Sequence, residues 1–464
     1  MDIKLNQQLP STFNDNKVCI IGLGYVGLTL AVTLAEIGFD VTGIEINEKI
    51  TKKLKKGIPH FYEQGLEGRI LTVINSERLK VFKKIPKKCE STIFIITVGT
   101  PIDEKNNVNK KMIYNVCNEI SSFLKKDDLI VLRSTVEVGT TKNLKKKILD
   151  KTNMEFDIAF CPERTIEGKA MIELRSLPQI IGTENMETSL RLSQFFSFMT
   201  PTVITVSSCD TAELIKLIDN CQRDVNFALS NEIAEISDEL GVSALEVINA
   251  GKLGYPRTNL PVPGPVGGPC LEKDSYILNN GLKKYIPKII MESRLVNKNQ
   301  PKKSIELLSE TIKIFFKDSK KELTNLNITV AGMAFKGQPE TNDLRGSMAK
   351  PIITEVIRNF PNSKLKIFDP IVTNKELKKF LPINDYLFTD SIQESFLNSS
   401  IYIICNNHPL FSSMAISGLS KKMKKPGIIF DYWNNFSDQK ITFPNEILYT
   451  GLGSLGKTLK TLKI

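Results

Sequence analysis

One cysteine stands in a setting where its thiol could act as a nucleophile. Cys270 follows two adjacent glycines, Gly267 and Gly268, and precedes Asp274 by four residues. Glycine has no Cβ, so the backbone there can turn tightly and pass close to a ligand. A thiol exposed at such a bend can attack an electrophilic carbon. Taken alone, a buried, inert cysteine is the commoner arrangement, so the rest of the chain must decide between these interpretations.

A second candidate group lies on a predicted helix. The run Asp210-Thr211-Ala212-Glu213 has the form of a capping box and predicts the start of a long helix that ends at about Leu240. Lys216 and Asn220 are four residues apart, so they would project from one face of this helix. Two donors aimed at one place can stabilise a developing oxyanion, although an exposed lysine beside a neutral asparagine is the commoner alternative.

A dinucleotide-binding pattern lies near the N-terminus. The apolar run from Val18 to Ile21 leads into Gly22-Leu23-Gly24-Tyr25-Val26-Gly27 and then into a helical stretch from Leu28 to Ile37. In such a strand, turn and helix, the first glycine makes the turn, the second lets the backbone approach a pyrophosphate, and the third lets the helix pack on the strand. The pattern predicts bound phosphates at the start of the helix.

The next predicted strand favours NAD as the dinucleotide. It runs from Val41 to Ile46 and carries Glu45 near the position where a carboxylate holds the ribose 2′-hydroxyl. A carboxylate at this place would repel a 2′-phosphate, so we expect NAD rather than NADP.

Further apolar runs alternate with helical patterns and predict a parallel, doubly wound sheet. Three polar segments follow predicted strands, where ligands bind in such sheets. Each could be only a loop, but together with the dinucleotide pattern they favour a cleft. The predicted strands are 92–98, 129–132, 157–160 and 179–182, and the segments are Gly99-Thr100-Pro101, Ser134-Thr135-Val136 and Cys161-Pro162-Glu163-Arg164.

The last third repeats the α/β pattern after a helical stretch, 284–316, that Pro301 should end or kink. Lys336 and Arg345 follow the first of its strands, where they could contact phosphate, although surface charge is the plainer alternative. We therefore expect an α/β protein with two Rossmann-like doubly wound domains joined by a central helical domain containing a long helix. The expected domains are 1–206, 207–318 and 319–464, and the strands of the last third are 328–335, 364–369, 401–405 and 427–431.

Composition narrows the class of protein. The 464 residues carry a net charge of +11, but the lysines are scattered and no basic stripe with interleaved aromatics occurs, so we expect no nucleic-acid partner. The eight cysteines lie far apart without a C-x-x-C pair, and only two histidines occur, so neither a disulfide framework nor a metal site is expected. Without a signal-like N-terminus or a membrane-length apolar run, a cytoplasmic protein is expected.

Taken together, these motifs resemble the UDP-glucose/GDP-mannose dehydrogenase family, NAD-dependent enzymes that oxidise the C6 alcohol of a nucleotide sugar to a carboxylate. The resemblance runs from Gly22 to Gly451-Leu452-Gly453 and includes Ala334-Phe335-Lys336 and Asp343-Leu344-Arg345. It implies polysaccharide biosynthesis as the wider setting and a homodimer as the active unit.

The resemblance also implies a role for each matching residue. Cys270 matches the thiol that forms a thiohemiacetal and then a thioester, and Lys216 and Asn220 match the oxyanion donors. Asp274 and Thr135 match residues that hold and activate water, and Glu163 matches an acid/base carboxylate. The implied NAD contacts are Gly22, Gly24, Tyr25, Val26, Gly27, Glu45, Thr100, Thr135 and Arg345; the implied substrate contacts are Glu163, Arg164, Lys216, Asn220, Gly267, Phe335, Lys336 and, from the neighbouring subunit, Arg257.

The chain departs from the family pattern at several places. Glu45 replaces the usual Asp, Ile50 a frequent Arg, and Pro269 a His or Ser, while Glu272 replaces a frequent Pro. No arginine occurs near Trp433, where some members contact the substrate with one.

The residues around Glu163 resemble those of family members that oxidise UDP-N-acetylhexosamines, and this resemblance implies UDP-N-acetylmannosamine as substrate, ahead of UDP-N-acetylglucosamine and UDP-glucose. A catalytically idle nucleotide-sugar or NAD-binding module is the alternative of another class. It would have no need of the Cys270 thiol.

Overall fold

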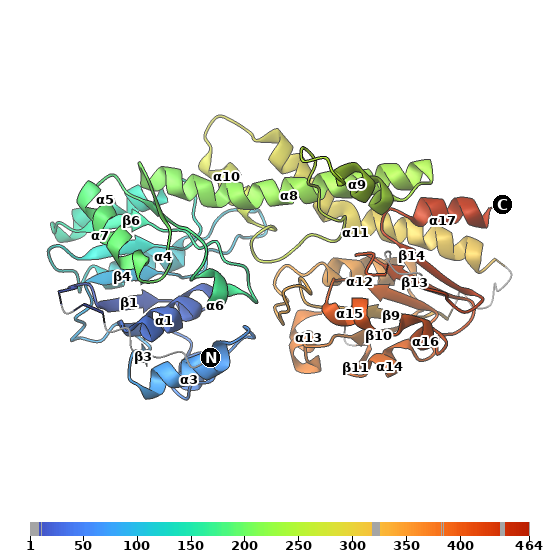
Figure 1. Cartoon of the computed structure of the whole chain (residues 1–464), viewed down its shortest axis with the longest axis horizontal. Helices are drawn as coiled ribbons and strands as arrows, with labels where there is room; N and C mark the ends of the chain where they lie inside the picture. The colour runs from blue at the N-terminus through green and yellow to red at the C-terminus, as the bar shows by residue number, and fades with distance from the viewer. Residues whose placement is uncertain are drawn as a thin grey trace. The chain divides into compact units, whose positions relative to one another are not determined.

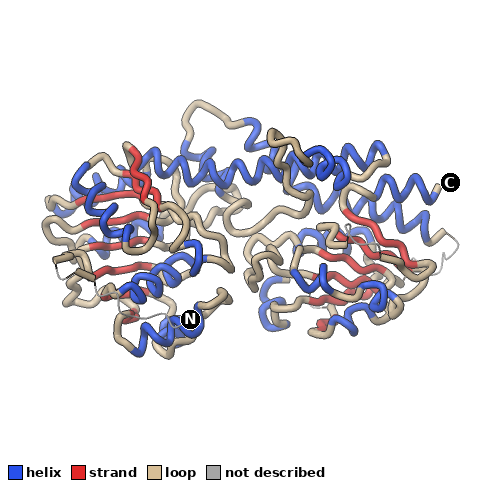
Figure 2. The backbone as a smooth tube through the Cα atoms, viewed as in Figure 1, coloured by secondary structure: helices blue, strands red, loops and turns tan. Residues whose placement is uncertain are grey.

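The computed structural model describes residues 9–10, 12–317, 325–381, 383, 385–436 and 441–463 (Figure 1). The chain divides into two compact units. The first unit comprises residues 1–220 and 273–286, and the second comprises 221–272 and 287–464. Among the described residues, each unit contains one β-sheet, whose strands are drawn in red in Figure 2.

The sheet of the first unit has the strand order β3-β2-β1-β4-β5-β6-β7-β8. All neighbours are parallel except β6 and β7, which pair antiparallel at Phe160 and Gly182, so the expectation of a parallel sheet is wrong at this one junction. The strands are β1 Lys17–Ile21, β2 Asp40–Ile44, β3 Leu79–Phe82, β4 Ile93–Ile96, β5 Leu129–Leu132, β6 Asp157–Phe160, β7 Gln179–Gly182 and β8 Val203–Val206.

Alternate residues of β1 enter two different cores, as period-2 side-chain alternation requires. Val18 and Ile20 pack with α1, α3 and α7, whereas Cys19 and Ile21 pack with α4 and α5 on the other face. The first unit is therefore doubly wound. These helices are α1 Tyr25–Ile37, α3 Leu66–Asn75, α4 Lys111–Ile120, α5 Thr140–Thr152 and α7 Met186–Ser197.

The second unit repeats this plan with the parallel order β11-β10-β9-β12-β13-β14. Val330 packs with α11 and α12 on one face, and its neighbour Ala331 packs with α14, α15 and α16 on the other. The elements are β9 Asn327–Ala331, β10 Lys364–Phe368, β11 Leu387–Thr389, β12 Ile401–Ile404, β13 Gly427–Asp431, β14 Ile447–Gly451, α11 Lys288–Phe315, α12 Ala349–Asn359, α14 Ile392–Phe396, α15 Pro409–Ser413 and α16 Ile416–Ser420.

The predicted capping box of the long helix is wrong. The helix, α8 Cys209–Leu240, begins one residue before Asp210, and the hydroxyl of Ser208 accepts from the Thr211 N–H at 3.1 Å. Glu213 does not reach back to a helix-start amide, because its carboxylate accepts from the N–H groups of Gly139 at 2.6 Å and Thr141 at 2.8 Å. The predicted end at Leu240 is confirmed.

Pro301 lies inside α11, which continues to Phe315, so of the two predicted outcomes, an end or a kink, the end does not occur. A proline costs one backbone hydrogen bond and a steric clash. Buried residues on both sides of it, from Asn297 to Ile312, hold the helix against the rest of the second unit and outweigh that local cost.

The short edge strands were not predicted. β3, β8 and β11 lie at sheet edges, and β8 buries none of its residues. The predicted domain boundary at 318/319 lies outside the described residues, and the division into three domains stays a prediction. The remaining helices are α2 Glu48–Leu54, α6 Ala170–Glu173, α9 Ala244–Lys252, α10 Asp274–Gly281, α13 Asn374–Phe380 and α17 Leu455–Leu462.

Where the chain is described, no helix is both long enough and apolar enough to cross a membrane.

Candidate active site

The three glycines of the N-terminal turn occupy three different environments. Gly22 has φ +96°, and a Cβ on Gly27 would come within 1.8 Å of the Gly22 carbonyl oxygen. A Cβ on Gly24 would meet no atom within 4 Å. Gly24 is the N-cap residue of α1, in an extended backbone conformation, and has no side chain with which to cap the helix. Close packing at Gly27 and open space at Gly24 fit a pyrophosphate at the start of α1.

Glu45 lies beside this turn. Its Oε2 accepts from the Leu23 N–H at 3.2 Å, and its Oε1 accepts from the Asn47 N–H at 2.8 Å. The carboxylate therefore borders the open space that Gly24 leaves, and each of its oxygens keeps a lone pair for a hydroxyl. These residues fit NAD, which supplies a hydride acceptor when bound.

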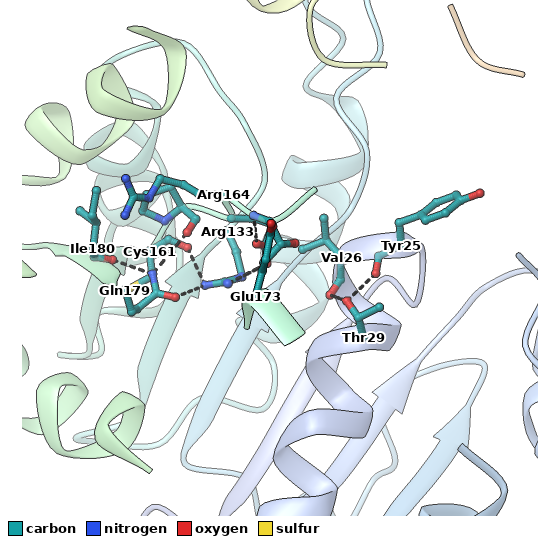
Figure 3. A network of polar contacts seen from close by, with 12 residues as sticks. Tyr25, Val26, Thr29, Arg133, Cys161, Arg164, Glu173, Gln179 and Ile180 are labelled. Carbon is teal, nitrogen blue, oxygen red and sulfur yellow. Dashed lines mark hydrogen bonds and ion pairs between the residues drawn. The ribbon is translucent and has the colours of Figure 1, made fainter. Parts of the chain in front are cut away.

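Tyr25 and Val26 form the first turn of α1. Tyr25 stacks on Phe61 with ring centroids 3.9 Å apart. Thr29 donates to the carbonyl oxygens of Tyr25 at 2.7 Å and Val26 at 3.2 Å, as Figure 3 shows. These contacts fix the helix start on which the nucleotide would rest.

The three polar segments leave the sheet at one edge, as predicted. Ile96, Leu132 and Phe160 end β4, β5 and β6 and are paired in register. The segments that follow therefore begin side by side. The hydroxyl of Thr100 donates to the Thr135 carbonyl oxygen at 2.7 Å, which joins the first two segments.

A continuous set of polar contacts runs from these segments to α8. Lys273 donates to the carbonyl and hydroxyl oxygens of Thr100, both at 3.2 Å, and lies 3.9 Å from Asp274 Oδ1. Asn220 on α8 donates to Asp274 Oδ2 at 2.6 Å. The first unit thus brings Thr100, Thr135, Asn220 and Asp274 together.

Asp274 is 1% exposed, and within the described part of the chain its Oδ1 has no hydrogen-bond partner. Burial raises the pKa of this carboxyl, and the charges of Lys273 and Lys216 together with the Asn220 hydrogen bond offset part of that rise. Lys216 is therefore close enough to act electrostatically on Asp274. A buried carboxylate oxygen with a spare lone pair is suited to hold a water molecule.

Glu163 forms a buried ion pair with Arg133. Arg133 donates to Glu163 Oε2 from Nη2 at 2.7 Å and from Nε at 3.2 Å, and the Thr165 N–H donates to Oε1 at 2.7 Å. Burial raises the Glu163 pKa, but the charge of Arg133 and these hydrogen bonds outweigh burial, so the pKa lies below its ordinary value. Glu163 is thus held as a carboxylate.

Arg133 organises the segment after β6. It also donates to the Cys161 carbonyl oxygen at 3.1 Å and to Gln179 Oε1 at 2.8 Å, contacts that Figure 3 marks with dashed lines. The next residue of that segment, Arg164, donates to the Pro178 carbonyl oxygen at 2.9 Å and lies 3.5 Å from Asp219 on α8. Asp219 immediately precedes Asn220, so Arg164 is tied to the helix that carries the predicted oxyanion donors.

Cys270 is exposed and belongs to the second unit. Gly268 has φ +96°, and a Cβ there would lie 2.5 Å from the ring of Phe335. A Cβ on Gly267 would lie 2.0 Å from the Gly346 carbonyl oxygen, which accepts from the Gly268 N–H at 2.8 Å. The cysteine loop therefore requires both glycines, as the sequence suggests, and packs against Phe335.

Three predicted cationic contacts also lie in the second unit. Lys336 lies 5.4 Å from the ring centre of Phe335. Arg345 is exposed and contacts Asp343 at 2.6 Å. Arg257 is exposed and lies 4.7 Å from the ring centre of Tyr255, in the segment between α9 and α10 that also carries Cys270.

Sequence reasoning missed Arg133 and Lys273. A signal for Arg133 was available, because an arginine directly follows the wholly apolar strand β5. Such a residue must find buried acceptors, and Arg133 is 3% exposed. Lys273 gave no signal beyond its place between Cys270 and Asp274.

Comparison with known proteins identifies the family. The NAD-binding domain of the UDP-glucose/GDP-mannose dehydrogenase family matches residues 16–200, its central domain 210–299 and its UDP-binding domain 329–438. The UDP-N-acetyl-D-mannosamine dehydrogenase of Methanococcus vannielii is 32% identical over 430 residues, which are 89% of this chain and 92% of that protein.

Two solved structures are similar over most of this chain. The UDP-D-ManNAc dehydrogenase of Pyrococcus horikoshii has a TM-score of 0.83 at 28% identity, covering 95% of this chain and 100% of that one. The UDP-N-acetyl-mannosamine dehydrogenase of Staphylococcus aureus has a TM-score of 0.79 at 27% identity, covering 96% and 100%.

The nucleotide turn and the polar groups at the sheet edge define an NAD-binding dehydrogenase. The chain belongs to the UDP-glucose/GDP-mannose dehydrogenase family and is a nucleotide-sugar dehydrogenase. The predicted family, fold class and cofactor are confirmed.

Proposed function

We propose that this enzyme oxidises the C6 alcohol of UDP-N-acetyl-D-mannosamine to the carboxylate. The names of the similar proteins from Methanococcus, Pyrococcus and Staphylococcus support this substrate. The observation that carries the chemistry is the buried Asn220–Asp274 contact, which joins an oxyanion donor to a water-holding carboxylate.

The reaction removes four electrons in two steps. The alcohol first loses a hydride to NAD and a proton, which gives an aldehyde. The Cys270 thiolate adds to that aldehyde and the oxygen takes up a proton, which gives a thiohemiacetal. The thiohemiacetal then gives up that proton and a hydride, for which a second NAD would be the acceptor, and becomes a thioester. Water then cleaves the thioester to the carboxylate and restores the thiol.

Each polar residue has a role in this scheme. Lys216 and Asn220 donate to the oxygen on C6 as charge develops on it. Asp274 holds the hydrolytic water through Oδ1, which accepts no hydrogen bond from the described residues, and Thr135 helps to orient that water. Glu163, held ionised by Arg133, accepts a proton rather than donating one.

The remaining residues bind the two nucleotides. Gly22, Gly24, Tyr25, Val26, Gly27, Glu45, Thr100 and Thr135 form the NAD site, with Arg345 as a further contact. Arg164, Gly267, Phe335 and Lys336 contact the UDP-sugar.

The thioester mechanism is tested by stoichiometry. The wild-type enzyme should form two NADH per sugar acid without released aldehyde. Cys270→Ala should stop the second oxidation and leave NAD binding intact, whereas Lys216→Ala should lower turnover by about 10²-fold with a smaller effect on substrate affinity. Full four-electron oxidation by Cys270→Ala would exclude the thioester.

The substrate is tested by following NADH absorbance with a panel of UDP-sugars. UDP-N-acetyl-D-mannosamine should give the highest kcat/KM, ahead of UDP-N-acetylglucosamine and UDP-glucose. Binding of NAD and a UDP-sugar without NADH formation from any member of the panel would favour an idle binding module instead.

We also propose a homodimer in which Arg257 completes the partner's substrate site. Leu229, Ile236 and Leu240 lie on one face of α8 and are each more than 45% exposed, which a second copy would cover. In the loop that carries Arg257, Leu253 is 85% exposed.

The dimer is tested by light scattering and by mixing two inactive variants. Unfolding and refolding Cys270→Ala and Arg257→Ala together should restore about a quarter of the activity, since half of the dimers would be mixed and each would have one intact site. No recovery, from two variants that are each inactive and dimeric, would place Arg257 in its own subunit's site. The three domains and the cytoplasmic location stay predictions.

A further inference from the structure

A buried polar network in the second unit holds the loop that carries Cys270. Its centre is Arg294 on α11, which is 4% exposed and pairs with Asp224 of α8 at 2.8 Å. Asp224 is 1% exposed. An ion pair this deeply buried needs further hydrogen bonds to satisfy its remaining donors and acceptors.

The Arg294 guanidinium also donates hydrogen bonds to the cysteine loop, the segment 253–273 between α9 and α10 that carries Cys270. Arg294 Nη1 donates to the Leu271 carbonyl oxygen at 2.9 Å, and Nη2 donates to the Val266 carbonyl oxygen at 3.3 Å. The two carbonyls lie on either side of Cys270 in the chain. One planar group therefore fixes both ends of the segment that bears the thiol.

Two asparagines extend the network to a third point of the same loop. Asn297 Nδ2 donates to Asp224 Oδ1 at 2.8 Å, and its Oδ1 accepts from Asn231 at 2.9 Å. Asn231 in turn accepts from the Gly264 N–H at 2.9 Å and donates to the Gly264 carbonyl oxygen at 3.1 Å. Asn231 and Asn297 are at most 1% exposed.

The loop needs these partners because it lies in no helix or strand between α9 and α10. Its buried backbone groups must find side chains instead. The result is a backbone fixed at Gly264, Val266 and Leu271 with an exposed cysteine side chain between the last two.

We propose that Arg294 is a positioning residue for the Cys270 thiol, with Asp224 as its counter-ion. This inference rests on the proposed role of Cys270. Misplacement of a reacting group by about 1 Å can cost 10²-fold in rate. A displaced thiol would capture the aldehyde poorly, while the first hydride transfer, which does not use the thiol, would continue.

Arg294→Lys tests the proposal. Lysine keeps the positive charge beside Asp224, so the fold should survive, but a single ammonium cannot span both carbonyls. We expect a fall in kcat for acid formation of about 10-fold or more. KM for the UDP-sugar and for NAD should stay within about threefold.

The decisive readout is aldehyde release. With a semicarbazide trap present, Arg294→Lys should release aldehyde and form more than two NADH per acid. Arg191→Lys alters another ion pair, the 2.6 Å contact with Asp15 in the first unit, and should keep the ratio at two. The rate at which iodoacetamide alkylates Cys270, measured by peptide mass spectrometry, should also change in Arg294→Lys alone.

Other results would overturn the proposal. Arg294→Lys with an unchanged NADH-to-acid ratio and an unchanged alkylation rate would make Arg294 a structural residue only. Arg294 would also be a structural residue only if Arg294→Lys and Arg191→Lys lowered the melting temperature and the activity to the same extent. Four-electron oxidation by Cys270→Ala would instead reject the proposed function, and the alkylation rate would then still report whether Arg294 fixes the loop.

Discussion

The two sheets begin with the same turn and continue differently. Gly22 follows β1 with φ +96°, and Gly332 follows β9 with φ +87°. The N–H of each donates across to the end of the next strand, Gly22 to the Ile44 carbonyl oxygen at 2.8 Å and Gly332 to the Phe368 carbonyl oxygen at 3.0 Å. After the turn, α1 begins at Tyr25, whereas α12 begins only at Ala349.

The acidic residue after the second strand shows the same divergence. Glu45 takes one backbone N–H on each oxygen, from Leu23 and from Asn47. Asp369 is 4% exposed and accepts from four N–H groups, those of Met333, Ala334, Ile371 and Val372. Its carboxylate oxygens therefore bind backbone groups of the two loops that follow β9 and β10.

This difference shows that strand order does not decide which ligand binds. The first unit leaves a helix start and a carboxylate available to a dinucleotide, and the second fills the equivalent places with its own chain. Function on such folds resides in the loops rather than in the sheet.

The largest effect is expected from Gly27→Ala. The new Cβ would overlap the Gly22 carbonyl oxygen at 1.8 Å and Thr97 Oγ1 at 2.5 Å, so α1 must move away from β1. We expect a loss of about 3 kcal/mol of unfolding free energy and no measurable NAD binding by calorimetry. Gly418→Ala in the second unit, where a Cβ meets nothing within 4 Å, is the matched control and should be neutral. Normal NAD affinity in Gly27→Ala would separate this turn from the cofactor.

Gly24→Ala should separate ligand binding from folding. Because its Cβ would meet no protein atom within 4 Å, the melting temperature should not change. The methyl group would enter the space assigned to the pyrophosphate, so NAD affinity should fall about tenfold or more. An unchanged Kd would mean that the phosphates lie elsewhere.

The sequence predicted many of the strands in both sheets, but not the long-range contacts by which the two units differ. The apolar runs of β5, β6 and β7 gave the observed boundaries, because strands buried on both faces of a sheet have near-continuous apolar sequences. The edge strand β8 is equally apolar in sequence, but none of its residues is buried, and it was not predicted. Nothing local could show that Glu213 binds Thr141, since these partners meet only in the folded chain.

The same limit applies to the candidate site. Cys270, Lys216, Asn220 and Asp274 were predicted as site residues from residue type, spacing and the family resemblance, and their roles stay predictions. Arg294 and Asp224 were not, because their contacts with the cysteine loop depend on the packing of α8 and α11.

Glu45→Gln should alter cofactor choice. Removing the negative charge relieves repulsion of a 2′-phosphate, so the preference for NAD over NADP should fall by about 10²-fold. Asp369→Asn is the counterpart in the second unit and should leave this ratio unchanged while it lowers stability, because four backbone donors lose a carboxylate. Steady-state kinetics with both cofactors gives the ratio. If both variants shifted the preference for NAD over NADP equally, the carboxylates would influence cofactor choice through the stability of the fold and not through contact with the ribose.

The smallest effect expected is an opposite pH dependence of two buried carboxylates, one in each unit. Burial raises the pKa of Asp15 in the first unit, but the hydrogen bonds from Arg191 and Thr92 and the charge of Arg191 outweigh it, so the pKa is lowered from 3.8. Its contribution to stability is present above the unfolded-state value and is lost as the pH falls through the folded-state value.

In the second unit, burial raises the pKa of Asp431 from 3.8 to about 6, and hydrogen bonds from Tyr449, Trp433 and Asn435 only partly oppose this. The folded state therefore holds the proton more tightly, and its stability should increase as the pH falls from about 6 towards 3.8.

Urea unfolding at closely spaced pH values from 3 to 7 tests both signs. Relative to wild type, Asp431→Asn should remove a gain on the order of 1 kcal/mol between pH 6 and 4. Asp15→Asn should lack the decrease in the free energy of unfolding that the Asp15 carboxyl causes in the wild type below pH 4. The curves should diverge in opposite directions, because one carboxyl is paired with an arginine and the other is buried among neutral donors. If Asp431→Asn had the same pH slope as wild type between pH 4 and 6, Asp431 would ionise in the fold as it does in water.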